Sequence, residues 1–130
     1  MGWISSFMSD RKTTLCFDQR ETDPKPIAAG IPQGSPISPI LFLFYNSELL
    51  EICNRTDLNA QAIGFIDDVN ALAWSRSAQH NVRILQRVHE RCIEWARRHG
   101  TKFAPDKYEL VHFTRRRKVN LNCGIQLGHV

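Results

Sequence analysis

Closely spaced cysteines are absent from this sequence. Its four thiols lie more than thirty residues apart, and no CxxC pair occurs, so neither a zinc ribbon nor a dithiol redox motif is supported. They are Cys16, Cys53, Cys92 and Cys123. His89 and Cys92 can share a helical face, as metal ligands sometimes do, but a surface histidine beside a buried thiol is the commoner arrangement. Thiols without a pattern suit a reducing compartment.

A long apolar run is also missing. Residues 39–45 form the most apolar stretch, which is far too short to cross a bilayer and is closed by Asn46, Glu48 and Glu51. The N-terminal residues MGWISSFM lack the basic start and the sustained apolar core of a signal peptide. We therefore expect an intracellular protein with no membrane segment, and nothing in the sequence distinguishes nucleus from cytoplasm.

The composition is that of a folded domain rather than of a disordered chain. Hydrophobic residues make up 42% and charged residues 23% of the 130 residues, which suits one domain with a moderate core. Lysine and arginine number 17 against 13 acidic residues, a net charge of +4, and the pI is about 9.1. This balance weakly favours a polyanionic partner.

The first third of the chain alternates short patterns with turns. Residues 3–8 are apolar and predict the end of a helix, and residues 13–17 are β-branched and aromatic, which predicts a strand. Residues 27–29 could return as a second strand. A helix is expected to begin with Ser35 or Ser38 as its cap and to run to about Ile52.

The remainder predicts a hairpin, a long helix and a strand. Residues 62–66 and 69–74 are strand-like, and residues 77–99 give the clearest helix, closed by Gly100. Residues 107–113 again read as a strand. This order of elements favours an α+β fold, in which helices pack on one face of an antiparallel sheet.

Asp67 and Asp68 lie between the two strand-like runs, at the spacing of a tight hairpin turn. Two adjacent aspartates are an unfavourable choice for such a turn, which invites a functional explanation. Their carboxylates could bind a hard cation such as Mg²⁺ at the hairpin tip. The alternative is a solvated acidic turn without a ligand.

A loop rich in proline and glycine precedes the first long helix. Residues 30–39 read GIPQGSPISP. Gly34 allows close approach of the backbone to a ligand, Gln33 offers an amide, and Ser35 offers a hydroxyl near a helix start, where the dipole favours phosphate. The alternative is a rigid connector.

Basic residues provide two weaker candidates. Lys107 could neutralise a triphosphate, although a lone surface lysine is more often simply solvated. A basic run could bind a nucleic-acid backbone, with a solvated charge cluster as its alternative. The run consists of Arg115, Arg116, Arg117 and Lys118.

Together these segments resemble the reverse transcriptases of non-LTR (LINE-like) retrotransposons. GIPQGSPISPILF (residues 30–42) looks like motif B of that family, and FIDD (residues 65–68) looks like motif C, an aromatic residue, any residue and two aspartates. Lys107, after a long helix and Pro105-Asp106, looks like motif D. Residues 3–17 resemble the helix and strand that precede motif B. The similarity extends over nearly the whole chain.

The resemblance implies synthesis of DNA from deoxynucleoside triphosphates on an RNA template with a DNA primer, on a polymerase palm that uses Mg²⁺, with Mn²⁺ as an alternative. Asp67 would then be a principal metal ligand and Asp68 its partner. The template and nucleotide site would include Gln33, Gly34, Ser35 and Phe65, with Lys107 beside the triphosphate. Phe65 replaces the more usual tyrosine, a change that keeps the ring, and we expect it to be tolerated.

Motif A of the family, which carries the first metal-binding aspartate, would precede the segment that matches Trp3. We therefore expect residues 1–130 to be a partial reverse transcriptase domain with motifs B, C and D, without motif A, most of the fingers or the thumb. Asp10 and Asp18 are poor substitutes for the missing carboxylate. Two-metal catalysis requires carboxylates that bridge both cations, so we expect no polymerase activity from this chain alone.

Two alternatives remain open at this point. The chain could be a basic nucleic-acid-binding remnant of a retroelement without catalysis, or an inactive product that folds poorly and binds nothing. Salt-dependent binding to an RNA–DNA hybrid would separate these two. Metal binding that is lost in Asp67→Ala would favour a retained catalytic architecture. The sequence does not indicate an oligomeric state.

Overall fold

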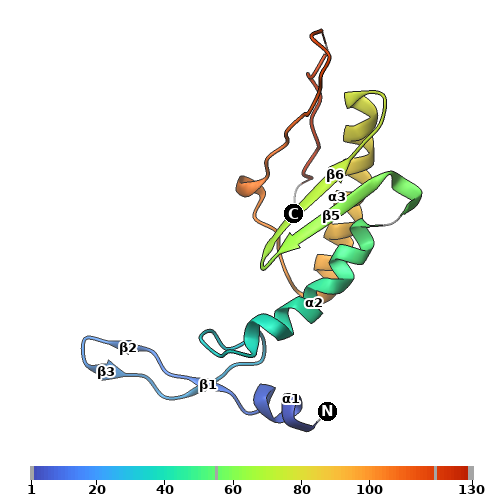
Figure 1. The fold of residues 1–130 in the computed structure, drawn as a ribbon. Helices are drawn as coiled ribbons and strands as arrows, with labels where there is room; N and C mark the ends of the chain where they lie inside the picture. The colour runs from blue at the N-terminus through green and yellow to red at the C-terminus, as the bar shows by residue number, and fades with distance from the viewer. Residues whose placement is uncertain (1, 55, 119, 129–130) are drawn as a thin grey trace. The chain divides into compact units, whose positions relative to one another are not determined.

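A computed structural model describes residues 2–54, 56–118 and 120–128 of the protein (Figure 1). The chain divides into two compact units, Met1–Phe42 and Leu43–Val130, and each is described by itself. Across the described residues, no helix combines the length and apolar character needed to cross a membrane.

The first unit contains one short helix and two short antiparallel strand pairs. Its elements are α1 (Gly2–Met8), β1 (Lys12–Thr13), β2 (Cys16–Phe17), β3 (Arg20–Glu21) and β4 (Lys25–Pro26). β1 pairs with β4, and β2 pairs with β3. Asp18 and Gln19 form the β2–β3 turn with φ angles of +46° and +62°, the two positive values that a type I′ turn requires.

The strands of this unit differ from the sequence prediction. The strand expected over residues 13–17 is interrupted, and the return strand lies at Lys25–Pro26 rather than at residues 27–29. No described residue of the unit is buried. β-Propensity reflects packing against neighbours, so without a core these residues form only two-residue ladders.

The proline-rich loop leads into α2 (Ser38–Cys53). Pro39 lies in the first turn of the helix, where its missing N–H is not needed. The Ser38 hydroxyl donates a hydrogen bond to the Pro32 carbonyl at 2.5 Å, and the Ser38 N–H donates to the Ser35 carbonyl at 3.1 Å. Ser38 therefore closes the loop as a donor, instead of accepting an amide as the cap that the sequence predicted.

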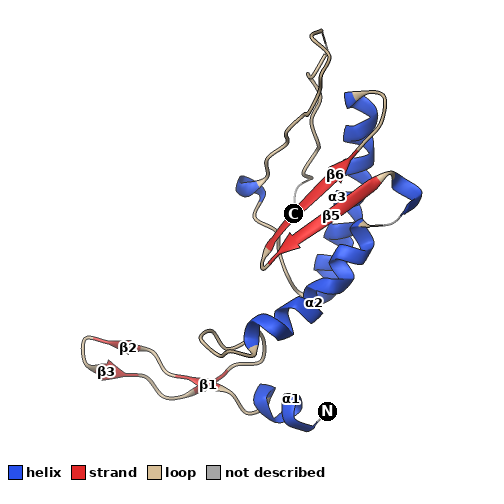
Figure 2. Cartoon of the chain, in the orientation of Figure 1, coloured by secondary structure: helices blue, strands red, loops and turns tan. Residues whose placement is uncertain are grey.

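The second unit packs two helices on one face of a hairpin (Figures 1 and 2). Besides the larger part of α2, it contains η1 (Thr56–Leu58), β5 (Ala60–Phe65), β6 (Asp68–Ala73), α3 (Ala78–His99) and η2 (Pro105–Lys107). Ala60 and Ala62 of β5 are buried toward the helices, whereas Gln61 and Ile63 are exposed on the other face, as strand alternation dictates. This arrangement is the predicted α+β fold with antiparallel strands.

Trp95 is the largest fully buried side chain and is 1% exposed. α2, the hairpin and α3 all contribute to the core around it, which also contains Leu49, Cys53, Leu58, Ala60, Ala62, Ile84, Val88, Cys92 and Ala96. The Glu48 carboxylate of α2 accepts a hydrogen bond from the Trp95 indole N–H at 3.2 Å. The core therefore lies behind the hairpin and joins it to both helices.

The ends of α3 confirm the predicted helix. The Ser77 side chain accepts a hydrogen bond from the His80 N–H, as an N-cap serine does. Gly100 has φ +64° and donates its N–H to the Ala96 carbonyl, as a glycine C-cap does.

The prediction of a strand over residues 107–113 is wrong. Pro105–Lys107 is a 3₁₀ helix, and residues 108–116 have no regular secondary structure (Figure 2). Their β-branched and aromatic content favours an extended backbone, but a strand also requires a hydrogen-bonding partner. Among the described residues, none pairs with this segment in a sheet.

Candidate active site

The tip of the β5–β6 hairpin lies one residue earlier than the sequence predicted. Phe65 pairs with Asp68 in the last rung of the ladder, so the two turn residues are Ile66 and Asp67 rather than Asp67 and Asp68. Ile66 has φ +54°, a left-handed conformation that is a genuine outlier for a β-branched side chain. Such a residue costs on the order of 1–3 kcal/mol and persists only where its surroundings impose it.

The two aspartates consequently occupy different backbone settings. Asp67 lies in the turn, and Asp68 is the first residue of β6, opposite Phe65. Strand alternation places Asp68 on the open face of the hairpin, because its neighbour Val69 packs against the core. Both aspartates are exposed, and Phe65 is 71% exposed. The site is thus a solvent-facing tip and not a cleft.

The donor set of the tip suits a hard divalent cation. Carboxylate oxygens are the ligands that Mg²⁺ prefers. Within the described part of the chain, neither Asp67 nor Asp68 has a hydrogen bond or an ion pair that would compete for these oxygens. No group of three or more His, Cys, Asp or Glu side chains that could hold a metal is present in the described ranges. The two aspartates therefore fit as part of a metal site and not as a whole one.

Helix α2 contacts the hairpin close to the tip at two points. A Cβ at Gly64 would lie 3.0 Å from the terminal carbons of Leu50, so glycine allows the helix to approach the strand closely. The Asn46 side-chain amide donates a hydrogen bond to the Ile66 carbonyl at 3.3 Å. The turn is therefore supported from the helical face, on the side opposite to Asp68.

The predicted motif B residues belong to the first unit. Gln33 and Gly34 are exposed in a turn, and Ser35 is half-buried. Gly34 has φ +87°, and nothing lies within 4 Å of the position that a Cβ would take. Glycine is thus required there by the backbone conformation rather than by crowding.

The predicted basic residues all lie on the surface of the second unit. Lys107 is exposed at the end of η2, and its N–H donates to the Ala104 carbonyl at 3.1 Å. It ends a 3₁₀ helix instead of opening a strand. Arg115, Arg116, Arg117 and Lys118 are exposed in an irregular segment. No interaction links Lys107 or this basic run to Asp67 within the described residues.

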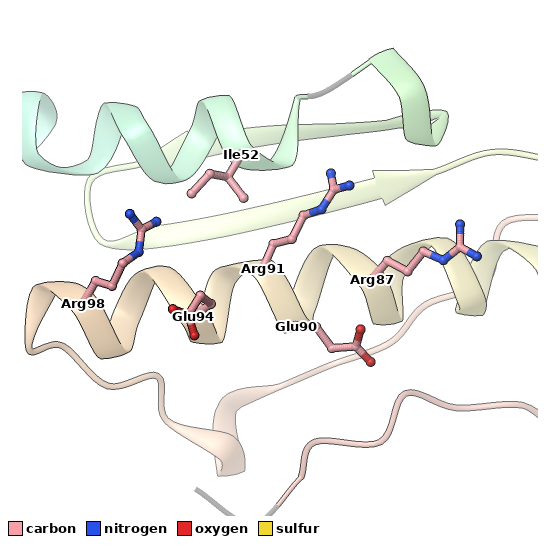
Figure 3. Close-up of a pocket in the computed structure, with 6 residues that line it drawn as sticks. All are labelled: Ile52, Arg87, Glu90, Arg91, Glu94 and Arg98. Carbon is pink, nitrogen blue, oxygen red and sulfur yellow. The ribbon is translucent and has the colours of Figure 1, made fainter.

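An open groove of about 450 Å³ lies between α2 and α3 (Figure 3). Arg91 and Arg98 extend from α3 toward α2, where Ile52 forms part of the wall (Figure 3). Arg91 pairs with Asp57 at 3.4 Å, and Arg98 lies 3.7 Å from Glu48. Neither Asp67 nor Asp68 lines the groove, so it is not part of this site.

His89 and Cys92 have separate partners. The Tyr108 hydroxyl lies 3.3 Å from His89 Nδ1, and the sulfur atoms of Cys53 and Cys92 are 3.3 Å apart in the core. Burial lowers the pKa of His89 below its ordinary value and raises that of Tyr108. The hydrogen bond with Cys53, together with burial, holds the pKa of Cys92 well above its ordinary range. The arrangement is that of packed side chains.

Sequence reasoning missed one residue of the tip, Ile66, and one residue of α2 that supports it, Asn46. Asn46 was interpreted as a polar residue that ends an apolar run, but it is 6% exposed and is the one buried polar residue in the part of the chain that the structure describes. Ile66 was placed inside a strand. The signal available for Asn46 is a single amide that follows an apolar run within the predicted helix, whereas the positive φ of Ile66 has no sequence signal.

Comparison with known proteins identifies the family. The profile described as "Reverse transcriptase (RNA-dependent DNA polymerase)" matches residues 1–124. The chain therefore belongs to the reverse transcriptase family, which confirms the resemblance drawn from the motifs.

Two curated relatives come from Drosophila melanogaster. The "RNA-directed DNA polymerase from mobile element jockey" is 27% identical over 116 residues, which is 87% of this chain and 13% of the relative. The "Probable RNA-directed DNA polymerase from transposon X-element" is 27% identical over 117 residues, 90% of this chain and 13% of the relative. The chain thus spans about an eighth of each relative. No solved structure matches it significantly.

Proposed function

We propose that this chain is the motif B to motif D part of the palm of an RNA-directed DNA polymerase. The polymerase extends a DNA primer with deoxynucleoside triphosphates on an RNA template. The observation that carries the proposal is the tip of the β5–β6 hairpin, where Asp67 and Asp68 are exposed and adjacent on a turn that a strained residue forms. Membership of the reverse transcriptase family supports the interpretation of this tip as part of a polymerase active site.

Asp67 and Asp68 hold Mg²⁺, or Mn²⁺ in its place, through their carboxylate oxygens. When bound, the metal lowers the pKa of the primer hydroxyl and stabilises charge on the transferred phosphate. Asp67 lies in the turn and Asp68 is the first residue of β6, so the primer terminus would lie at the exposed tip, close to both residues. Phe65, beside Asp68 in the last rung, offers a ring for that terminus to pack against.

The remaining predicted residues bind substrate rather than metal. Gln33, Gly34 and Ser35 contact the template and the incoming nucleotide from an exposed turn, where the open space at Gly34 admits close approach. Lys107 neutralises the triphosphate. The basic run from Arg115 to Lys118 binds the nucleic-acid backbone, which makes affinity salt-dependent.

A third carboxylate completes the site. Two-metal transfer needs ligands that bridge cations about 4 Å apart, and adjacent aspartates on a hairpin diverge. Within the described residues, Asp67 and Asp68 belong to no cluster of three metal-ligating groups. We therefore propose that the 130-residue chain by itself does not extend a primer, and that it acts with a carboxylate supplied by further polypeptide.

The test is a chimaeric polymerase. The 116-residue stretch of the jockey polymerase that matches this chain is replaced by the chain, and incorporation of deoxynucleotides is measured on an RNA template with a DNA primer. The chimaera is expected to extend the primer, and Asp67→Asn is expected to reduce extension to background. Asp57→Asn, which removes an exposed carboxylate paired with Arg91, is the matched control and is expected to remain active.

Two outcomes would contradict the proposal. A chimaera in which Asp67→Asn extends as well as its parent would remove the carboxylate from catalysis. A chimaera that binds the RNA–DNA hybrid with strong salt dependence, yet extends nothing, would favour the non-catalytic nucleic-acid-binding alternative. Primer extension by the isolated chain above an Asp67→Ala control would contradict the need for a third carboxylate.

A further inference from the structure

The β5–β6 hairpin could form in two strand registers, and the observed register is the one that local backbone preference disfavours. In the observed register, Gly64 pairs with Val69 and the turn consists of Ile66 and Asp67. Moving the turn one residue along the chain would pair Gly64 with Ala71 and would leave the inward and outward faces of both strands unchanged. Burial by the helices therefore does not by itself decide between the two registers.

Local backbone preference favours the register that is not observed. The first turn position has a positive φ here, +54° at Ile66, and the second turn residue, Asp67, does not. This combination has the φ signs of a type II′ turn, whose first position is normally glycine. In the alternative register Asp67 would take the first position, and aspartate tolerates a left-handed backbone far better than isoleucine does. An interaction specific to the observed turn must therefore offset the strain at Ile66.

Asn46 provides that interaction. Its side chain is 6% exposed, and its Nδ2 lies 3.3 Å from the Ile66 carbonyl oxygen. A carbonyl oxygen only accepts, so the atom of Asn46 that faces it is the NH₂ group. Losing the partner of a buried donor is unfavourable, and the bond forms only when Ile66 is in the turn with its carbonyl directed at α2.

We propose that Asn46 is a positioning residue for the catalytic tip, because its amide selects the register that places Asp67 in the turn and Asp68 on the ladder. In the alternative register both aspartates would lie in the turn, and Asp68 would lose its place opposite Phe65. The inference rests on the proposed function in so far as the carboxylates bind metal. The choice of register is a separate matter, which can be measured without metal.

The experiment compares four variants of the 130-residue chain. Asn46→Leu removes the donor and keeps an apolar side chain in the core. Asn54→Leu is the matched control, because Asn54 directly follows the same helix and its side chain accepts a hydrogen bond from the Ala62 N–H of the same hairpin at 2.6 Å. Ile66→Gly and the double variant Asn46→Leu/Ile66→Gly supply a residue that takes a positive φ without strain.

Cross-strand NOEs give the register directly. Wild type, Asn54→Leu, Ile66→Gly and the double variant are expected to show the contact between Gly64 and Val69. Asn46→Leu is expected to lose it in favour of a contact between Gly64 and Ala71, or of no ordered tip. Mn²⁺ affinity, measured by paramagnetic broadening of tip resonances, is expected to fall several-fold in Asn46→Leu alone and to recover in the double variant.

Each result decides the proposal. If Asn46→Leu keeps the contact between Gly64 and Val69 and the Mn²⁺ affinity of the wild type, Asn46 does not set the register. Unfolding of both Asn46→Leu and the double variant would assign Asn46 to core stability alone and would also overturn the proposal. If Asn46→Leu unfolds while the double variant folds with the wild-type register, the proposal stands. Absence of Mn²⁺ binding in the wild type would count against the proposed metal role, and the NOEs would still decide the role of Asn46.

Discussion

The two units of this chain differ in what holds them in place. The unit Leu43–Val130 has a core in which α2, the β5–β6 hairpin and α3 bury the side chains around Trp95. The unit Met1–Phe42 contains no buried residue in its described part, and its strands are two residues long. The loop that resembles motif B thus belongs to a segment without a core, whereas the Asp67 turn belongs to a segment with one.

A segment with a recognisable family motif therefore need not have a core of its own. The first unit carries ten residues, GIPQGSPISP, whose order resembles a family motif, but it leaves Leu15 and Phe17 exposed. The second unit carries the short FIDD segment at the end of a hairpin that packs on both helices, and α2 contacts it through the hydrogen bond from Asn46 to the Ile66 carbonyl. Geometry at the tip is therefore set inside these 130 residues, while the first unit depends on local turns and hydrogen bonds.

The largest expected effect is at the centre of the core. Trp95→Ala is expected to destabilise the second unit by about 3–5 kcal/mol, because it removes the largest fully buried side chain and leaves a cavity. Urea denaturation followed by circular dichroism measures this. Trp3→Ala, at a residue that is 61% exposed in the first unit, is the matched control and is expected to change stability by less than about 0.5 kcal/mol. Equal losses in both variants would erase the distinction between the units.

A smaller effect is expected where α2 is joined to α3. The Glu48 carboxylate accepts a hydrogen bond from the indole N–H of Trp95 at 3.2 Å and lies 3.1 Å from His99 Nε2. Glu48→Leu leaves the indole N–H without its partner and is expected to cost about 1–3 kcal/mol in unfolding free energy. Glu51→Leu, at an exposed residue of the same helix, serves as the control. A neutral result at Glu48 would show that the helices are joined by apolar packing alone.

Relief of strain at the tip is expected to stabilise the second unit. Ile66→Gly removes a β-branched residue from φ +54°, and glycine takes that conformation without steric cost. Glycine also gains more conformational entropy on unfolding, which offsets part of this gain. The free energy of unfolding is therefore expected to rise by about 0.5–1 kcal/mol. Thermal unfolding measures the change. Ile63→Gly, in the regular part of β5, is expected to destabilise instead. Destabilisation by Ile66→Gly would mean that the Ile66 side chain contributes more than its backbone strain costs.

The reactivity of the cysteine thiols is also expected to differ between the two units. Cys16 in the first unit is exposed, whereas Cys53 and Cys92 are buried in the second. The raised pKa of Cys92 further reduces its thiolate fraction. A maleimide or aromatic disulfide reagent is expected to label Cys16 within seconds to minutes and to label Cys53 and Cys92 only on unfolding. Mass spectrometry of the labelled peptides measures this. Rapid native labelling of Cys92 would show that the core opens readily.

The smallest expected effect is a pH dependence that comes from His89. Burial lowers its folded pKa below the ordinary value of 6.5, so below about pH 6.5 the unfolded chain binds more protons than the folded chain. Stability is therefore expected to fall slightly as the pH drops through 6.5, until it passes the folded pKa. The difference between wild type and His89→Gln across pH 5–8, measured by urea denaturation, isolates this contribution. An increase in wild-type stability toward low pH relative to His89→Gln would reverse the assigned direction.

Patterns with strong local signals were predictable from the sequence. Ser77 and Gly100 mark the ends of α3 because cap residues act locally, and the two strand-like runs at residues 62–66 and 69–74 predict the hairpin. The buried face of α3 includes Ile84 and Trp95, whereas Leu85 and His89 are only half-buried. An amphipathic pattern predicts that the segment is a helix, whereas the residues that the helix buries depend on the surface against which it packs.

Features that depend on distant partners were not predictable. The spacing of the two strand-like runs predicts a turn at Asp67 and Asp68, yet the turn lies at Ile66 and Asp67 and is accompanied by a hydrogen bond from Asn46, twenty residues earlier. Residues 107–113 have strand-like composition but no sheet partner among the described residues. In both cases the outcome depends on tertiary contacts, present at the turn and absent at residues 107–113, rather than on local preference.

The central claim is that the tip of the β5–β6 hairpin binds a divalent cation through Asp67 and Asp68. Titration of the chain with Mn²⁺, with amide resonances observed by NMR, tests it most directly. Broadening is expected to begin at Phe65 to Asp68, and to be lost in Asp67→Asn/Asp68→Asn but retained in the control Asp57→Asn. Broadening that is spread over other acidic residues, or that persists unchanged in the double variant, would contradict the claim.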